Sequence, residues 1–191
     1  MTPMLLTPPA GEPILLADAK AWLRLDTTAE DDSVSMLITA ARLIVESTTR
    51  KLLLAQIWRL TGDAWPQSNI VKIPLAPFQA IVAMRVLDAN GVAQVLNPSL
   101  YTLDASPDGA RLLFKAAPPP PGQVIAGIQI DVAAGYGVVP ASVPEPMRQA
   151  MRMLIARWYE NRGDVAMDSG AAHLPASVAA LLSPYRQMRL Q

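Results

Sequence analysis

The sequence predicts an α+β fold: a small helical bundle with long helices near residues 29–50 and 144–162, an inserted antiparallel β-rich domain and an extended C-terminal tail. Apolar residues recur every three to four positions before residue 51 and again after Pro140, which is typical of amphipathic helices. Between these stretches the period falls to about two, the pattern of strands. A chain of 191 residues buries roughly 70% of its unfolded surface, so it needs neither a metal nor a disulfide to fold.

Two helices are predicted in an N-terminal helical part that covers residues 1–50. The first is short and amphipathic and ends near Arg24. Thr27 and Thr28 then supply hydroxyl groups that can cap a helix, and the acidic residues 30–32 suit the positive end of the helix dipole. The second, longer helix is therefore expected to begin near Ala29.

The long helix carries more apolar residues than one core face needs. Its predicted core face holds Val34, Leu37, Ile38, Ala41, Ile44 and Val45. A polar face expected to meet solvent holds Ser35, Thr39, Arg42 and Glu46. Met36, Ala40 and Leu43 remain, and they form a second apolar strip roughly opposite the core face. This strip predicts a second packing partner, from this chain or from a neighbouring subunit.

Residues 51–143 are predicted to be the β-rich insertion. Its short β-rich runs cover residues 57–61, 70–73, 81–88, 92–96, 100–103, 111–114 and 124–132. The sequences DANG at residues 88–91 and SPDG at residues 106–109 lie between apolar runs and are signals for hairpin turns. Because hairpins join antiparallel neighbours, we expect an antiparallel sheet domain.

The third main helix is placed at residues 144–163. Pro144 and Pro146 flank Glu145, a composition that the first turn of a helix tolerates. Its apolar face holds Met147, Ala150, Met151, Leu154 and Trp158. Gly163 can adopt the left-handed conformation that ends a helix.

Residues 164–191 are predicted to form a mobile loop followed by a C-terminal docking segment, with two helical turns near residues 175–182. The end of this segment combines aromatic, methionine and arginine side chains, which are enriched at protein interfaces: Tyr185, Arg186, Met188, Arg189 and Leu190. We therefore expect it to dock on another protein. The alternative is a helix folded back on the bundle, which the apolar residues Val178, Leu181 and Leu182 would permit.

Composition excludes several classes of function. The chain has no cysteine, which removes disulfides, thiol catalysis and cysteine-ligated metals. Sixteen basic and sixteen acidic residues cancel, which argues against sequence-independent binding of DNA or of a membrane surface. No apolar run approaches the ~20 residues of a membrane span. With 51% apolar and 17% charged residues, the chain is expected to bury part of its own surface in contacts with other chains.

No catalytic, cofactor-binding or metal-binding residue is predicted, and the protein is not expected to be an enzyme. The one histidine, His173, lies in a small-residue stretch with no catalytic triad motif around it. The acids at residues 30–32 are consecutive and lack the spacing of a calcium loop. The GYG sequence at residues 135–137 is followed by VVP, not by a phosphate-binding helix. The arginines of the third helix are interpreted as a solvated, partly ion-paired face, with recognition of an acidic protein surface as the alternative.

Taken together, several segments resemble the head-to-tail connector (adaptor) proteins of long-tailed bacteriophages and of the gene transfer agents derived from them. In chain order they are LADAKAWLR at residues 16–24, EDD at 30–32, AAR at 40–42, TRKL at 49–52, IPLAPF at 73–78, YTL at 101–103, GYG at 135–137, VP at 143–144, WYENRG at 158–163 and LLSPYR at 181–186. The order and spacing of these short pieces over nearly the whole chain carry the resemblance. The long β-rich stretch departs from the smallest, almost wholly helical members.

The resemblance implies a structural protein without a cofactor, located at the head–tail junction of a virion or gene transfer agent particle and made in the bacterial cytoplasm. Such connectors form a homo-oligomeric ring, typically twelve-fold, beneath the portal protein. A stopper or tail protein assembles on the ring, and double-stranded DNA passes through it without sequence-specific binding. Met36, Ala40 and Leu43 would then lie between subunits, and the C-terminal segment would dock on the portal.

An alternative interpretation is a soluble protein-interaction module. In that case the β-rich domain would bind a peptide or protein along an exposed edge strand. A ring needs lateral contacts on two different faces of each subunit, whereas a module needs only one groove.

Overall fold

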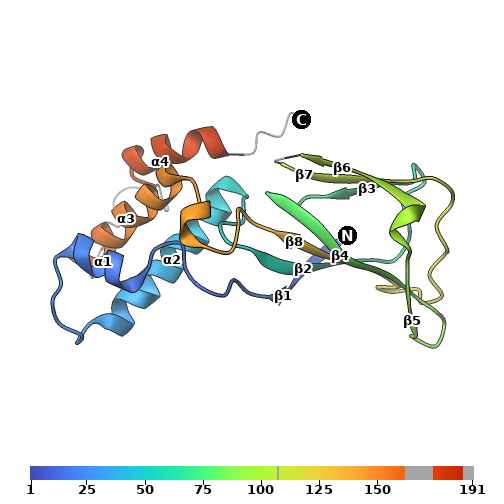
Figure 1. Ribbon diagram of the computed structural model, residues 1–191, viewed down its shortest axis with the longest axis horizontal. Coiled ribbons are helices and arrows are strands. Elements are labelled where there is room, and N and C mark those ends of the chain that lie inside the picture. The colour runs from blue at the N-terminus through green and yellow to red at the C-terminus, as the bar shows by residue number, and fades with distance from the viewer. Residues whose placement is uncertain (107, 162–173, 187–191) are drawn as a thin grey trace, which may run out of the picture. The chain divides into compact units, whose positions relative to one another are not determined.

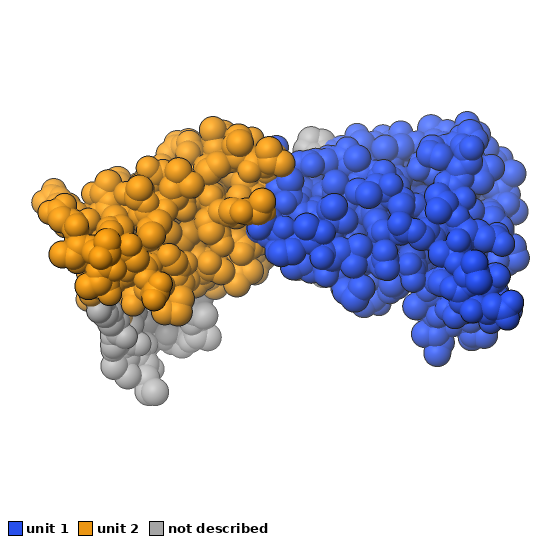
Figure 2. Space-filling view, turned by 60° about the horizontal axis from the view of Figure 1, so that its bottom comes forward, with its two compact units in different colours: residues 1–9, 55–136 blue, residues 10–54, 137–191 orange. Residues whose placement is uncertain are grey.

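The computed structural model describes residues 1–106, 108–161 and 174–186 (Figure 1). Within these residues the chain forms four α-helices and two antiparallel sheets, which confirms the predicted α+β class with a β-rich domain. The chain divides into two compact units, coloured separately in Figure 2. Unit 1 comprises residues 1–9 and 55–136, and unit 2 comprises residues 10–54 and 137–191.

Unit 1 contains the two sheets. Its strands are β1 (Thr2–Thr7), β2 (Gln56–Gly62), β3 (Ile70–Ile73), β4 (Phe78–Leu87), β5 (Ala93–Val95), β6 (Tyr101–Ser106), β7 (Gly109–Phe114) and β8 (Ile128–Ala134). The five-stranded sheet has the order β1-β2-β8-β4-β5, and the three-stranded sheet has the order β3-β7-β6. All neighbouring strands pair antiparallel.

Residues from both sheets form one hydrophobic core. It is formed by Leu60, Val71, Ile73, Met84, Val86, Leu96, Ala110, Leu112, Phe114, Ile128, Ile130 and Val132. Alternate residues of β7 and β8 enter it, as the two-residue period of a strand requires. Trp65 closes the core with its ring edge-on to Phe114, at a centroid distance of 4.9 Å.

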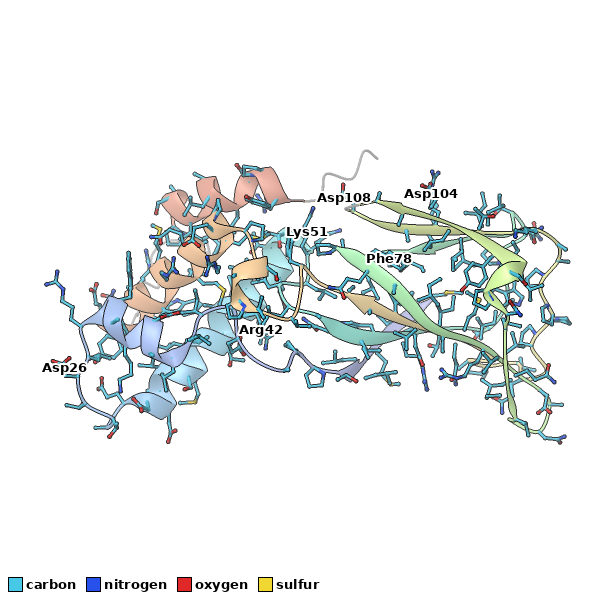
Figure 3. All side chains as sticks on the ribbon, in the orientation of Figure 1. Asp26, Arg42, Lys51, Phe78, Asp104 and Asp108 are labelled. Atoms are coloured by element: carbon cyan, nitrogen blue, oxygen red, sulfur yellow. The ribbon has the colours of Figure 1, made fainter. Side chains whose placement is uncertain are left out.

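Both predicted hairpins are confirmed. In the first, Gly91 N donates to Asp88 O at 3.0 Å, and β4 pairs with β5. In the second, Ser106 pairs with Gly109 at the end of β6 and β7. Gly109 has φ +130°, and a Cβ there would lie 2.4 Å from the carbonyl oxygen of Ile73, so only glycine fits. Asp104 and Asp108 both lie on this hairpin (Figure 3).

Unit 2 contains the helices α1 (Leu16–Leu23), α2 (Asp31–Thr49), α3 (Glu145–Glu160) and α4 (Ala176–Leu182). Helix α3 packs against the other three. Its buried residues are Met147, Ala150, Met151, Leu154 and Ile155, in the three-to-four-residue spacing that an amphipathic helix produces. Trp158, predicted on this face, is not among its buried residues.

The sequence pattern does not predict strand β1, because it places residues 1–50 in the helical part. Strand β1 pairs with β2 along its length, from Thr2 opposite Thr61 to Thr7 opposite Ile57. All six of its residues are exposed, so its sequence shows no alternation of apolar and polar side chains. The backbone pairing with β2, which is far away in the sequence, is what makes this segment a strand.

Helix ends also differ from the prediction. The N-cap of α2 is Glu30 instead of a threonine, and it makes no capping hydrogen bond through its side chain. Lys20 of α1 holds this end through a 2.6 Å ion pair with Asp31. The C-cap residues of α1 and α2 are Arg24 and Arg50, both in the left-handed conformation that glycine usually supplies.

Candidate functional site

The second apolar strip of α2 faces solvent within unit 2. Met36 is 67% exposed and Leu43 is 53% exposed, while Ala40 between them is partly exposed. The core side of the helix is already complete, because Val34, Ile38, Ala41 and Val45 are buried. The structure thus leaves these three apolar side chains available to another surface.

Two residues of the predicted core face of α2 are displaced from the core. Ile44 is exposed and Leu37 is only partly buried. The buried face is therefore narrower than the predicted one. Ile44 follows Leu43 in the helix, and its exposed side chain adds to the apolar surface of the second strip.

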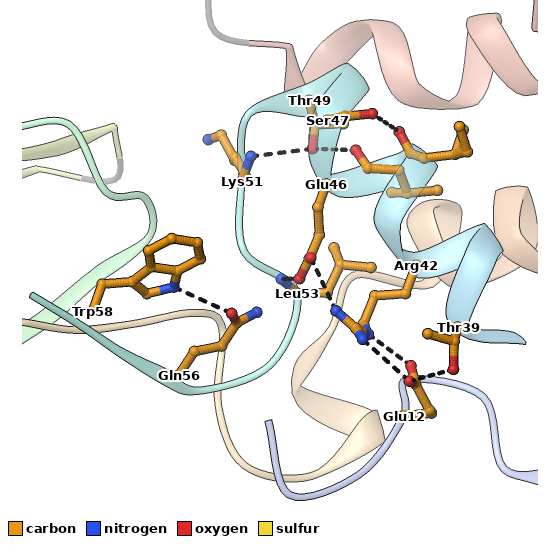
Figure 4. A network of polar contacts seen from close by, with 12 residues as sticks. Glu12, Thr39, Arg42, Glu46, Ser47, Thr49, Lys51, Leu53, Gln56 and Trp58 are labelled. Carbon is orange, nitrogen blue, oxygen red and sulfur yellow. Dashed lines mark hydrogen bonds and ion pairs between the residues drawn. The ribbon is translucent and has the colours of Figure 1, made fainter. Parts of the chain in front are cut away.

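Arg42 is the clearest correction to the predicted polar face. Its side chain is only 11% exposed and lies between two glutamates (Figure 4). Arg42 Nε donates to Glu12 Oε2 at 2.8 Å, and Nη1 donates to Glu46 Oε2 at 3.2 Å. Thr39 Oγ1 also donates to Glu12, at 3.0 Å. Burial lowers the pKa of Arg42, but the hydrogen bond and the charge of Glu12 outweigh it and raise that pKa overall.

This network fixes two non-helical segments of unit 2 to α2. Glu12 belongs to the segment that precedes α1, where Ile14 is buried. Glu46 Oε1 accepts the backbone N–H of Leu53 at 2.9 Å, and Leu53 is itself buried in the segment after α2. One arginine thus connects α2 to the segments before α1 and after α2, so its role is structural.

A pocket of about 350 Å³ lies between α1, α3 and α4. Its lining residues are Trp22, Met153, Ala156, Arg157, Glu160, Asn161, Pro175, Ser177 and Val178. Five of these nine side chains are apolar, and one of them, Trp22, is about half exposed. The sequence prediction did not identify this pocket, because it forms only where three separate segments meet.

A buried carboxylate lies on the five-stranded sheet. Asp131 of β8 is almost fully buried and accepts hydrogen bonds from Arg59 of β2, at 2.7 Å and 2.9 Å. Arg85 of β4 pairs with the same carboxylate. The hydrogen bond from Arg59 is the largest cause that holds the pKa of Asp131 below its usual value. The group joins three strands and is a structural contact.

The arginines of α3 are paired as the sequence analysis expects. Arg152 Nη1 donates to Glu145 Oε1 at 2.5 Å, and Arg148 pairs with the same carboxylate. Hydrogen bonding from Arg152 is the first cause of the lowered pKa of Glu145. This face is therefore ion-paired, as expected, but it is not a solvated surface, because the side chains of Arg148 and Arg152 are only 23% and 19% exposed.

Only part of the predicted C-terminal docking segment packs on its own unit in the structure. Helix α4 folds back on α3, with Val178 and Leu182 fully buried, so this part of the predicted docking segment packs on its own unit. Beyond it, Tyr185 is partly buried and Arg186 is exposed. The other predicted residues, Met188, Arg189 and Leu190, lie outside the described residues, as does His173.

The part of the chain that the structure describes shows neither a metal site nor a membrane-spanning helix. In those residues, no three histidine, aspartate or glutamate side chains are grouped so that they could hold a metal ion. None of the helices in the same ranges has both the length and the apolar character to cross a membrane. The features that remain as candidates for function are surfaces: the second apolar strip, the pocket and the exposed ends of the sheets.

Comparison with known proteins gives matches among solved structures only. No protein-family model matches the chain, and no curated protein sequence matches it. One similar structure is the virion of a native gene transfer agent particle, with a TM-score of 0.83 and 28% identity. Two others are the neck of an empty gene transfer agent particle, computed with C6 symmetry, and the neck of a native one, computed with C12 symmetry. Each of these two has a TM-score of 0.81 and 27% identity.

The match covers 100% of this chain and 98% of the matched chain in all three structures. Both units are therefore included, the β-rich one as well as the helical one. These matches confirm the resemblance to connector-type proteins of gene transfer agents and the expected location at the head–tail junction of such a particle. They also support a structural component of the neck.

Proposed function

We propose that this chain, with the fold of a gene transfer agent neck component, is the head-to-tail connector that forms a ring beneath the portal and bridges it to the stopper or tail. The observation that carries the proposal is the match over the full chain to neck structures, one of them computed with C12 symmetry. A closed ring of twelve copies is consistent with that symmetry.

Burial of apolar surface is the proposed mechanism of ring formation. Met36, Ala40 and Leu43 form a subunit contact, which Ile44 extends. A standard interface buries about 800 Å² on each partner, so this strip supplies only part of the ring contact. In a closed ring every copy covers the same strip, and no apolar face is left in solvent.

Passage of double-stranded DNA fits the charge distribution. The chain has no net charge, and several of its arginines are already paired with carboxylates: Arg42, Arg59, Arg85, Arg148 and Arg152. Tight phosphate binding depends on basic side chains that release counterions from DNA. A neutral ring instead lets the duplex move through without holding it.

The portal is the proposed partner of the C-terminal end. Helix α4 stays packed on α3, and the docking residues are Tyr185, Arg186, Met188, Arg189 and Leu190. Aromatic, methionine and arginine side chains of this kind supply most of the binding energy at many interfaces. The proposed role consists of binding alone, without a catalytic or cofactor-dependent step.

Deletion of the gene tests this function in the producing bacterium. We expect DNA-filled heads that carry a portal but no tail, and restoration of tailed particles when the gene is supplied in trans. Normal tailed particles from the deletion strain would contradict the connector role. Tailless heads that still contain the stopper would contradict the order of assembly.

A further inference from the structure

We propose that the β-rich unit also joins neighbouring copies in the ring, with the β1 edge of one copy packed on the β5 edge of the next. This inference rests on the ring of the proposed function and assigns a role to the β-rich insertion. The partner on each side is a second copy of this chain.

The two edges lie at opposite sides of one sheet. In the order β1-β2-β8-β4-β5, strands β1 and β5 are the outermost members, and each has a neighbour on one side only. A cyclic ring is built from head-to-tail contacts, in which two different surfaces of each subunit meet. Opposite edges of a single sheet satisfy this requirement, because one subunit can contact both neighbours at once.

The β1 edge is apolar and uncovered. It consists of the exposed side chains Met1, Met4, Leu5 and Leu6. All residues of β1 are exposed, although the strand is paired with β2 on one side. Apolar side chains in a row on an ordered strand mark a contact surface more strongly than scattered ones do.

The β5 edge carries four exposed large apolar side chains, among them the two most exposed of the described chain. It consists of Val92, Val95, Val124 and Ile125. Val124 is 85% exposed, Ile125 is 78% exposed and Val95 is 70% exposed. The first two lie in the loop before β8, and the others belong to β5 and the turn before it.

The loop that presents Val124 and Ile125 is fixed by hydrogen bonds at both ends. Gly122 N donates to Leu87 O at 2.8 Å, and Leu87 N donates to Gly127 O at 2.8 Å. In addition, Ala126 N donates to Asp63 Oδ1 at 2.8 Å. A Cβ at Gly122 would lie 2.3 Å from the backbone nitrogen of Ala89, so the loop lies directly on the β4–β5 turn. The fold thus holds the backbone in place while it directs two apolar side chains into solvent.

The chemistry of the two edges is complementary. Residues 89–103 and 116–130, which include the β5 edge, contain no charged side chain. Residues 1–11, which include the β1 edge, contain none either. The edge segments therefore contribute no charged side chain to the contact. The nearest ones, Arg59 opposite Met4 and Arg85 opposite Val95, are already paired with Asp131, so no unpaired ion is buried. A surface without cations also does not suit the phosphates of DNA.

Side-chain packing, and not a shared backbone ladder, is the mode of contact. Pro3 has no N–H to donate, the pairing of β1 has an irregularity between Leu5 and Thr7, and β5 is only three residues long. Four large side chains on each edge are also fewer than the ~20 residues a side of a standard interface. The edge contact therefore adds to the second apolar strip and does not hold two free copies together.

Cross-linking in assembled particles tests the inference, because the native chain has no cysteine to interfere. We would supply the Leu5→Cys/Val95→Cys double variant in the deletion strain, purify particles and treat them with a short bis-maleimide. The expected result is a ladder of multimers on a denaturing gel. Each single variant is expected to give monomers only, since a head-to-tail contact never brings a residue next to its own copy. The Leu5→Cys/Leu113→Cys variant is the matched control, because the exposed Leu113 lies in the other sheet.

Immunoblotting of the purified particles separates this inference from the proposed function. If the chain is present at the neck but the double variant gives no ladder, the edge contact is overturned and the connector role stands. If the unsubstituted chain is not in the particles, the connector role itself fails. Dimers from either single variant would overturn the head-to-tail arrangement. A second double variant, Thr2→Cys/Gln94→Cys, changes only exposed polar residues. If both double variants fold but neither enters particles, while the Leu5→Cys/Leu113→Cys control does, the edges are needed for assembly, as proposed.

Discussion

Glu12 and Arg42 are thirty residues apart in the chain, yet Arg42 Nε lies 2.8 Å from Glu12 Oε2. The same guanidinium contacts Glu46, which holds the backbone N–H of Leu53. Each group in this network depends on the others, because removal of the cation would leave two carboxylates close together and partly buried. The network stabilises the helical unit that carries the second apolar strip.

Replacement of Arg42 by methionine tests this dependence. We expect the free energy of unfolding to fall by about 2 kcal/mol, since the variant removes charge-assisted hydrogen bonds and keeps most of the apolar volume. Urea unfolding followed by circular dichroism measures the change. The control is Arg111→Met, which breaks the exposed pair with Asp104 and should cost less than ~1 kcal/mol. Equal effects of the two variants would contradict the structural role of Arg42.

Acid stability is predicted to depend on Asp131. Hydrogen bonding from Arg59, followed by that from Arg85, lowers the pKa of this buried carboxyl in the folded protein. A lowered pKa contributes stability above the unfolded value of ~3.9, and this stability is lost as the pH falls through the folded value. Asp131→Asn should therefore lower the melting temperature at pH 7 and flatten its decline below pH 4. The exposed Asp104→Asn variant is the control, and an unchanged acid profile of Asp131→Asn would refute the assignment.

Ala40→Glu tests the second apolar strip. Ala40 is partly exposed, so a charged side chain there reaches solvent in the free chain and should change its unfolding free energy by less than ~0.5 kcal/mol. In a dry subunit contact the same charge would be unpaired and would cost several kcal/mol. The variant should therefore fold but fail to join particles. Ser35→Glu, on the exposed polar face of the same helix, should assemble normally, and normal assembly of Ala40→Glu would remove the strip from the interface.

Truncation separates the packed part of the C-terminal segment from the proposed docking part. A chain that ends at Ser183 keeps α4, including the buried Val178 and Leu182, and should retain its melting temperature while it loses binding to the portal. A chain that ends at Leu174 lacks α4 and should be destabilised by several degrees, because two core side chains are removed. Portal binding by the Ser183 truncation at native strength would rule out docking through residues beyond it.

The sequence predicts the elements whose own residues determine them. Helices α2 and α3 have a clear three-to-four-residue period, and the turns at residues 88–91 and 106–109 have the residues that tight hairpins need. Strand β1 has no period of its own and is defined by pairing with β2, so local patterns do not reveal it. For the same reason the loop before β8, held by Leu87 and Asp63, looks like strand in the sequence.

The candidate surfaces also differ in whether the sequence predicts them. Met36 and Leu43 are predictable because a helical wheel separates them from the core face. The burial of Arg42 is not predictable, because its partner Glu12 lies outside the helix and a helical wheel shows only that the face of Arg42 is polar. The pocket and the two sheet edges require the tertiary arrangement, since each combines residues from distant parts of the chain.

Native mass spectrometry of the purified chain, with and without its purified portal, tests the connector role most directly. We predict that the chain binds the portal in a fixed ring stoichiometry, with twelve copies per portal ring, and that the Ser183 truncation does not bind. Mass photometry at low concentration gives an independent measure of the same complex. A chain that stays monomeric and unbound in the presence of an intact portal ring would contradict the connector role.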